Sequence, residues 1–150
     1  MHGPMLFDRY LNRPEATAAV RDDEGWVRTG DVVAVDADGT HRIVGRVSTD
    51  LIKSGGFRIG AGEVEDALRA HPGVRDAAVV GWPDDDLGQR VVAFVIAEGV
   101  RPDVLADFVS TRLARHKRPR AVFLVDDLPR NALGKVRKTL LGPPTAAPAR

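Results

Sequence analysis

The stretch Asp50-Leu51-Ile52-Lys53-Ser54-Gly55-Gly56-Phe57-Arg58-Ile59 sets a pair of glycines between two short runs of apolar and charged residues. Adjacent glycines permit backbone shapes that other residues avoid, and they let a narrow ligand approach the main chain closely. The flanking cations Lys53 and Arg58, with Arg46 upstream, suit phosphate groups. The spacing does not fit the Gly-x-Gly-x-x-Gly loop that binds dinucleotides. Two interpretations stay open: a glycine hairpin with solvated charges, or a loop that meets a narrow phosphorylated ligand.

Downstream of the glycine pair, two segments have the apolar spacing of amphipathic helices. Residues 63–70 place Val64, Ala67 and Leu68 on one face, and the sequence His71-Pro72-Gly73 ends this helix. The second helix is expected at 102–116, with acidic residues early and basic residues late, as the helix dipole favours. Its expected core stripe consists of Leu105, Phe108, Val109 and Leu113.

Apolar segments rich in β-branched residues lie between and after these helices. We expect strands at 76–81, 89–97 and 121–125, a polar loop at 82–88 and a last short helix at 136–141. The sequence therefore predicts a small α+β domain at 51–141, with a central, roughly three-stranded sheet and flanking helices. A flexible tail is expected at 142–150, where proline and alanine predominate.

The first 46 residues are predicted to be loop and β-structure. Apolar residues at 31–35 and 40–44 flank the turn Asp36-Ala37-Asp38-Gly39, and an Asp-Gly pair between such runs is a hairpin signal. An isolated hairpin is marginally stable in water. We therefore expect residues 1–46 to be the edge of something larger.

Composition argues against several classes of protein. Lys and Arg number 22 against 21 Asp and Glu, and the resulting net charge of +1 argues against a general nucleic-acid or membrane-surface binder. No apolar run approaches the ~20 residues of a membrane span. The chain has no cysteine, which is compatible with a reducing cytoplasm, and its four histidines lack metal-ligand spacing. We expect a cytoplasmic protein without a metal site of its own.

A carboxylate and a lysine stand out in two further motifs. In Arg28-Thr29-Gly30-Asp31, the Asp31 carboxylate is either an acceptor for a vicinal diol, as in a ribose, or a turn aspartate before a strand. In Pro129-Arg130-Asn131-Ala132-Leu133-Gly134-Lys135, Lys135 is either a compact cation delivered to an anion or a solvated surface lysine. The second motif is not a Walker A loop, because proline replaces the first glycine and Val136 replaces Ser or Thr.

Taken together and in this order, these motifs resemble the adenylate-forming (ANL) superfamily of acyl-CoA synthetases, luciferases and peptide-synthetase adenylation domains. The resemblance runs from Gly3 to Leu141, and residues 49–65 and 128–131 look most like malonyl-CoA and methylmalonyl-CoA synthetases. It implies that 1–46 is the last β-structure of a large N-terminal adenylation domain, 47–50 a hinge and 51–141 the mobile C-terminal domain. We expect such a fragment to be inactive alone.

The resemblance also implies an AMP-forming acid–thiol ligase reaction in two steps. A carboxylate attacks the α-phosphate of ATP, which is bound with Mg²⁺ mainly by the missing N-terminal domain, and the thiol of coenzyme A then attacks the acyl-adenylate. Lys135 would act in the first step, Asp31 and Arg46 would bind the nucleotide, and the hinge would lie at Ser48 and Thr49, where this sequence departs from the aspartate or lysine of many relatives. The residues implied for coenzyme A are Ser54, Gly55, Gly56 and Arg58, with the basic run 115–120 as a further candidate.

Two other functions remain as alternatives. In several relatives the lysine at the position of Lys135 is acetylated, so this chain is either part of the ligase alone or also the substrate of a GNAT-type protein acetyltransferase and a deacetylase. A basic nucleic-acid-binding module is the third interpretation, and the near-zero net charge speaks against it.

Overall fold

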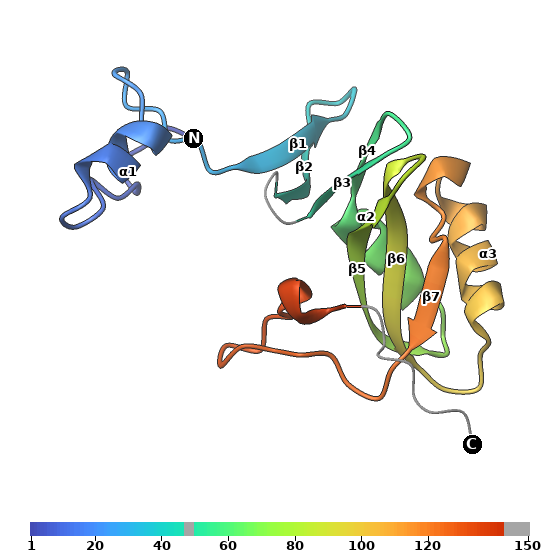
Figure 1. Cartoon of the computed structure of the whole chain (residues 1–150). Coiled ribbons are helices and arrows are strands. Elements are labelled where there is room, and N and C mark those ends of the chain that lie inside the picture. The colour runs from blue at the N-terminus through green and yellow to red at the C-terminus, as the bar shows by residue number, and fades with distance from the viewer. Residues whose placement is uncertain (47–49, 143–150) are drawn as a thin grey trace. The chain divides into compact units, whose positions relative to one another are not determined.

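The computed structural model describes residues 1–46 and 50–142, and the chain divides into two compact units, Met1–Ile43 and Val44–Arg150 (Figure 1). The hinge residues expected at Ser48 and Thr49 and most of the expected tail therefore lie outside the described residues. The two units are described separately below.

The first unit contains a short helix and most of a hairpin. Helix α1 (Pro14–Val20) lies in a segment that was expected to hold loop and β-structure only, so that expectation was wrong. Three features explain this helix. Pro14 at its start has a fixed helical φ, the charge of Glu15 suits the positive end of the helix dipole, and three of the seven residues are alanine, the best helix former. Strands β1 (Asp31–Val35) and β2 (His41–Arg46) pair in a two-stranded sheet, as the Asp-Gly turn predicts.

The second unit is built on a five-stranded sheet, wider than the three strands predicted. Its order is β4-β3-β6-β5, and β7 also pairs with β6. The two additional strands are the arms of the glycine hairpin, which the sequence left open as one of two interpretations. The pairings are antiparallel except for β6 with β7, which run parallel. The strands are β3 (Leu51–Ser54), β4 (Phe57–Gly60), β5 (Val74–Asp84), β6 (Gly88–Ala97) and β7 (Ala121–Leu124).

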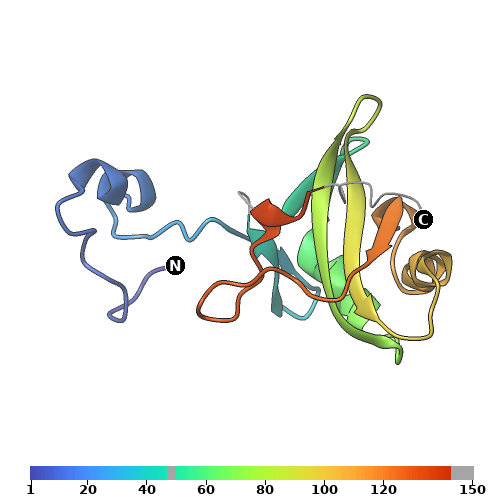
Figure 2. The ribbon, with the colours of Figure 1, turned by 60° about the horizontal axis from the view of Figure 1, so that its bottom comes forward.

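Two layers cover the two faces of this sheet. Helices α2 (Ala61–Arg69) and α3 (Pro102–Arg112) pack on one face, where Val64, Leu68 and Leu105 are fully buried among alternate residues of β5 and β6. The segment after β7 covers the other face (Figure 2). There Leu128 is fully buried against residues such as Phe94. Alternate residues of one strand point to opposite faces, so both faces of β5 and β6 are apolar.

Most predicted boundaries lie within two residues of those in the structure, and three predictions differ by more. The helix expected to reach residue 116 ends at Arg112, because the Thr111 hydroxyl donates to the Phe108 carbonyl and Leu113 is extended; a 3-10 turn η1 (Arg115–Lys117) follows. The loop expected from residue 82 is strand as far as Asp84, because the Trp82 ring packs on Phe94 and Phe123. The last predicted helix is only a 3-10 turn, η2 (Lys138–Leu140).

Candidate functional site

The glycine pair forms the tight turn between β3 and β4. Ser54 pairs with Phe57, so the turn has two central residues, and both have positive φ, 55° at Gly55 and 82° at Gly56. This geometry is typical of a type I′ hairpin, which glycine adopts without strain. The Gly55 N–H donates to the Leu87 carbonyl at 3.0 Å, which ties the turn to the β5–β6 connection.

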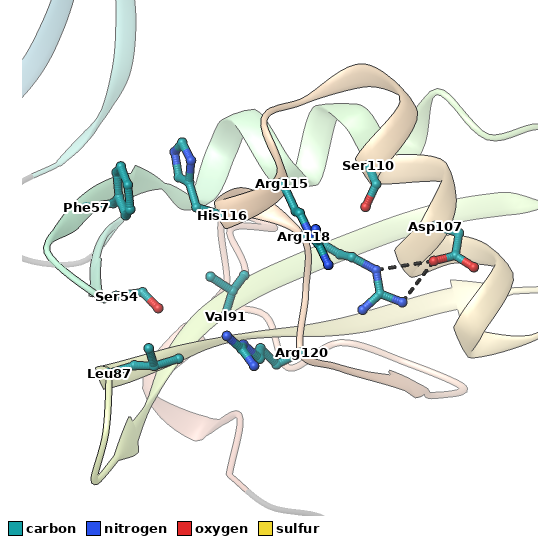
Figure 3. Close-up of a pocket in the computed structure, with 11 residues that line it drawn as sticks. Ser54, Phe57, Leu87, Val91, Asp107, Ser110, Arg115, His116, Arg118 and Arg120 are labelled. Atoms are coloured by element: carbon teal, nitrogen blue, oxygen red, sulfur yellow. Dashed lines mark hydrogen bonds and ion pairs between the residues drawn. The ribbon is translucent and has the colours of Figure 1, made fainter.

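A pocket of about 930 Å³ opens beside this turn (Figure 3). The hairpin contributes Ser54 and Gly55 of the predicted coenzyme A residues, and the segment around η1 contributes four of the basic residues predicted at 115–120. Gly56 and Arg58, which were predicted for the same role, are not among the lining residues. The lining is Ser54, Gly55, Phe57, Leu87, Val91, Asp107, Ser110, Arg115, His116, Arg118 and Arg120.

The pocket carries an excess of positive charge. Arg115, Arg118 and Arg120 line it, and the one acidic lining residue, Asp107, accepts hydrogen bonds from Arg118 at 2.9 and 3.2 Å. Because a single carboxylate faces three guanidinium groups, the lining favours an anion. Lys117 is not part of the lining; its Nζ pairs with Glu63 of α2 at 2.6 Å.

Phe57 and His116 add a flat aromatic surface to the pocket. Their ring centroids are 4.0 Å apart and the planes differ by 10°, which is a stacked pair (Figure 3). Phe57 directly follows the glycine turn, and about half of its surface is exposed, 51%. Sequence analysis missed this pair because its members lie 59 positions apart. The one available signal was an aromatic residue directly after the two glycines.

Lys135 lies in a separate turn that side chains hold in shape. The Asn131 side-chain oxygen accepts from the Leu133 and Lys135 N–H groups at 3.0 and 2.9 Å, and Gly134 has a φ of 80°. Arg130 donates to the Gly134 carbonyl at 2.8 Å. The Lys135 residue itself is exposed, so a defined backbone presents a solvated cation.

The Lys135 turn and the pocket are attached at opposite ends of β6. Ser54 beside the pocket pairs with Gly88, whereas Arg130 before the Lys135 turn pairs with Asp76, whose partner on β6 is Ile96. Ile96 lies eight positions after Gly88, or about 27 Å of strand at about 3.4 Å per residue. The structure therefore does not bring Lys135 and the glycine turn into one site.

The predicted nucleotide residues lie outside both places. Asp31 begins β1 in the first unit, and its N–H contacts the Thr29 hydroxyl oxygen at 3.2 Å. Arg46 is the last residue of β2, is exposed, and accepts a hydrogen bond at its carbonyl from the Asp50 N–H at 2.9 Å. Sequence reasoning placed Asp31 at the start of a strand and Arg46 just before the hinge, and their roles toward a nucleotide stay predictions.

Helix α2 and two arginines form a charged network at the outer edge of β5. Glu65 accepts from the Val79 N–H at 2.8 Å, and Arg69 donates to the Ala77 carbonyl at 2.9 Å, so side chains satisfy the free edge of this strand. Partial burial raises the pKa of Asp76, but hydrogen bonds from Arg69, the Ala77 N–H and Arg130 outweigh it and hold that pKa below its ordinary value.

Groups of metal ligands and membrane-spanning helices are both absent from the described residues, 1–46 and 50–142. No group of three or more His, Asp or Glu side chains there is placed to hold a metal ion. No helix in the same residues is long and apolar enough to cross a membrane.

Known proteins share this fold and these sequence motifs. Residues 63–135 match the family described as the AMP-binding enzyme C-terminal domain. The chain is 44% identical over 141 residues to the mitochondrial malonate–CoA ligase ACSF3 of Bos taurus, covering 92% of this chain and 24% of that protein. It is 46% identical over 144 residues to the 3-[(3aS,4S,7aS)-7a-methyl-1,5-dioxo-octahydro-1H-inden-4-yl]propanoyl:CoA ligase of Mycobacterium tuberculosis, covering 94% and 28%.

Solved structures agree with these matches. ATP-bound MatB from Rhodopseudomonas palustris superposes with a TM-score of 0.81 at 37% identity, covering 93% of this chain and 28% of that one. The small mixed-sheet domain with its glycine hairpin and Gly-Lys turn thus defines the class, the adenylate-forming (ANL) enzymes. Residues 63–135 belong to the AMP-binding enzyme C-terminal domain family, and the chain matches the C-terminal portion of such enzymes.

These findings confirm the predicted α+β fold class and the resemblance to acyl-CoA synthetases. The chain spans about a quarter of the length of the curated relatives it matches.

Proposed function

We propose that this chain is the C-terminal part of an ATP-dependent, AMP-forming acyl-CoA synthetase. The observation that carries the proposal is the pocket that joins the Ser54-Gly55 turn to three arginines, on a domain whose Gly-Lys turn is anchored at the far end of the same strand. Two separate chemical faces suit a reaction with two separate steps. The relatives support the class of reaction, since those reported above are named as CoA ligases.

In the first step, Lys135 serves adenylation. A carboxylate oxygen attacks the α-phosphorus of Mg-ATP and pyrophosphate leaves, so negative charge builds on phosphate and carboxylate oxygens. An aimed ammonium group stabilises that charge, and losing such a contact commonly costs ~10²–10³ in rate. Asp31 accepts hydrogen bonds from the ribose hydroxyls and Arg46 lies beside the nucleotide. We assign the carboxylate-binding pocket to the large N-terminal domain of the complete enzyme.

In the second step, the pocket binds coenzyme A. The sulfur attacks the acyl carbon of the acyl-adenylate and AMP leaves. A turn with no side chains at Gly55 suits the narrow pantetheine arm, and Arg115, Arg118 and Arg120 suit its phosphates. The stacked Phe57–His116 pair offers a flat surface to the adenine ring. The adjacent Arg58, exposed on β4, is a further phosphate contact.

The proposal is tested by Lys135→Ala in the complete protein. We expect loss of pyrophosphate release by ~10²–10³-fold, while thioester formation from supplied acyl-adenylate continues. Pyrophosphate exchange and CoA thioester assays measure the two steps separately. Equal loss of both steps would refute a role restricted to adenylation.

Malonate or methylmalonate is the acyl substrate that we infer. The sequences at 49–65 and 128–131, with the identity to a malonate–CoA ligase, support it. A panel of malonate, methylmalonate, a medium-chain fatty acid and a polycyclic propanoate separates this choice from those of the other relatives. Location in the cytoplasm stays a prediction, since one relative is named as mitochondrial.

A second proposed role is that Lys135 accepts an acetyl group from a GNAT-type acetyltransferase and is restored by a deacetylase. Its exposure in a well-defined turn favours this role. Acetylation removes the positive charge, so adenylation should stop while thioester formation persists. Mass spectrometry after incubation with acetyl-CoA and such an enzyme measures the modification, and unmodified Lys135 would count against it.

A further inference from the structure

A row of alternating charges runs along the outer edge of β5, from the Lys135 turn to Asp50. Asp76 contacts both Arg130 and Arg69, and Arg69 Nη2 lies 3.6 Å from Glu65. Lys138 Nζ lies 2.8 Å from Glu65 and 2.7 Å from Asp50. The row in order is Arg130, Asp76, Arg69, Glu65, Lys138 and Asp50.

Lys138 lies at the most enclosed part of this row. Its side chain is 19% exposed, between Glu65 at 10% and Asp50 at 24%. One ammonium group thus joins η2, helix α2 and the chain that leads into β3. Ion pairs in such half-buried places are screened less by solvent than surface pairs are.

The row holds the Lys135 turn at both ends. Arg130 precedes the turn, donates to the Gly134 carbonyl inside it and pairs with Asp76 on β5. Lys138 follows Lys135 by three residues and fastens the chain to Glu65 and Asp50. The turn between these two anchors has its own backbone hydrogen bonds but exposed side chains, so the anchors decide where it lies on the domain.

We propose that Lys138 is a positioning residue for Lys135 in adenylation. The inference rests on the proposed function, because it takes Lys135 as the adenylation cation. Removing the Lys138 charge breaks the two ion pairs that hold the C-terminal side of the turn to Glu65 and Asp50, so the placement of the turn becomes less exact. A misplacement of ~1 Å far from the reacting atoms can cost ~10²-fold in rate. Val136 and Leu141 still pack on the sheet, so the segment stays docked.

The test uses Lys138→Met in the complete protein, which keeps an unbranched apolar stem and removes the charge. We expect kcat for pyrophosphate exchange to fall by ~10–100-fold with an unchanged KM for ATP, and thioester formation from supplied acyl-adenylate to remain. Lys138→Arg keeps a cation between the two carboxylates and should restore exchange. Hydrogen–deuterium exchange should quicken in the peptide that covers residues 130–138 and stay unchanged in α3.

Lys117→Met is the matched control. Lys117 also makes a half-buried ion pair with α2, at 2.6 Å to Glu63 and 22% exposure, but it lies on η1, away from the Lys135 turn. We expect this variant to adenylate at the rate of the unsubstituted protein. Equal adenylation losses in both lysine variants, or no loss in Lys138→Met, would overturn the inference. Failure of the unsubstituted protein to exchange pyrophosphate would instead refute the proposed function itself.

Discussion

Gly55 and Gly56 occupy one turn but have different surroundings. A Cβ added to Gly55 would lie 3.2 Å from a methyl group of Leu87, whereas one added to Gly56 would meet nothing within 4 Å. Gly55 lines the pocket and Gly56 does not. Substitutions at the two glycines can therefore separate the effect of backbone strain from the effect on a ligand in the pocket.

We predict that Gly55→Ala weakens coenzyme A binding more than Gly56→Ala does. Both alanines adopt a left-handed conformation and should lower the free energy of unfolding by about 1–2 kcal/mol. Only position 55 lines the pocket, so the new methyl group of Gly55→Ala should raise the KM of that variant for coenzyme A and leave pyrophosphate exchange unchanged. Steady-state kinetics of the second step, with urea unfolding for stability, measure both effects. Matching KM changes in the two variants would contradict the placement of Gly55.

At the scale of elements, helix α2 does more than cover the sheet. Its apolar side, with Val64 and Leu68, fills the core, while Glu65 and Arg69 occupy the hydrogen-bonding edge of β5. Asp76 on that edge keeps its charge because Arg69 and Arg130 both contact it. Stability should therefore depend on the ionisation of this carboxylate.

We predict that Asp76→Asn lowers stability at neutral pH by about 2 kcal/mol, the value of a hydrogen bond to a charged group. The folded pKa of Asp76 lies below the ordinary 3.8, so its contribution is complete above about pH 5 and is lost as pH falls through the folded value. The difference between the two proteins should accordingly vanish in acid. Urea unfolding of the chain between pH 3 and pH 7 measures it.

Asp66→Asn is the control for that measurement. Asp66 contacts the same Arg69 at 3.0 Å, but its side chain is 80% exposed. Solvent screens such a pair, so this substitution should change stability little at any of these pH values. A loss as large as that of Asp76→Asn would show that burial is not the deciding factor.

Local sequence patterns predicted the helices and strands better than they predicted which distant residues contact each other. The apolar spacing of α2 and the runs of β5, β6 and β7 appear in the structure because period and composition act within each element. The Phe57–His116 stack and the Lys138–Asp50 pair join residues 59 and 88 positions apart, respectively, and no local rule specifies such contacts. Helix α3 ended early because side-chain hydroxyl groups competed for its last carbonyls.

At the scale of the whole molecule, the second unit has two working ends. The glycine turn and the pocket are fastened at Gly88, and the Lys135 turn is fastened near Ile96 of the same strand. The anchor residues Gly88 and Ile96 lie about 27 Å apart along β6, so the glycine turn and the Lys135 turn do not belong to one site. The proposed reaction therefore requires the domain to present these two ends one after the other, and the hinge at Ser48 and Thr49 stays a prediction.

The packing of Trp82 has a practical consequence. The chain has two tryptophans, one in each unit, and Trp26 is 50% exposed. Trp82 packs edge-on against Phe94 and at a tilt against Phe123, and it donates its indole N–H to the Leu141 carbonyl at 3.3 Å. The indole of Trp82 is thus a natural fluorophore that touches the end of the segment bearing Lys135. Its emission reports, without any added label, whether that segment is docked on the sheet.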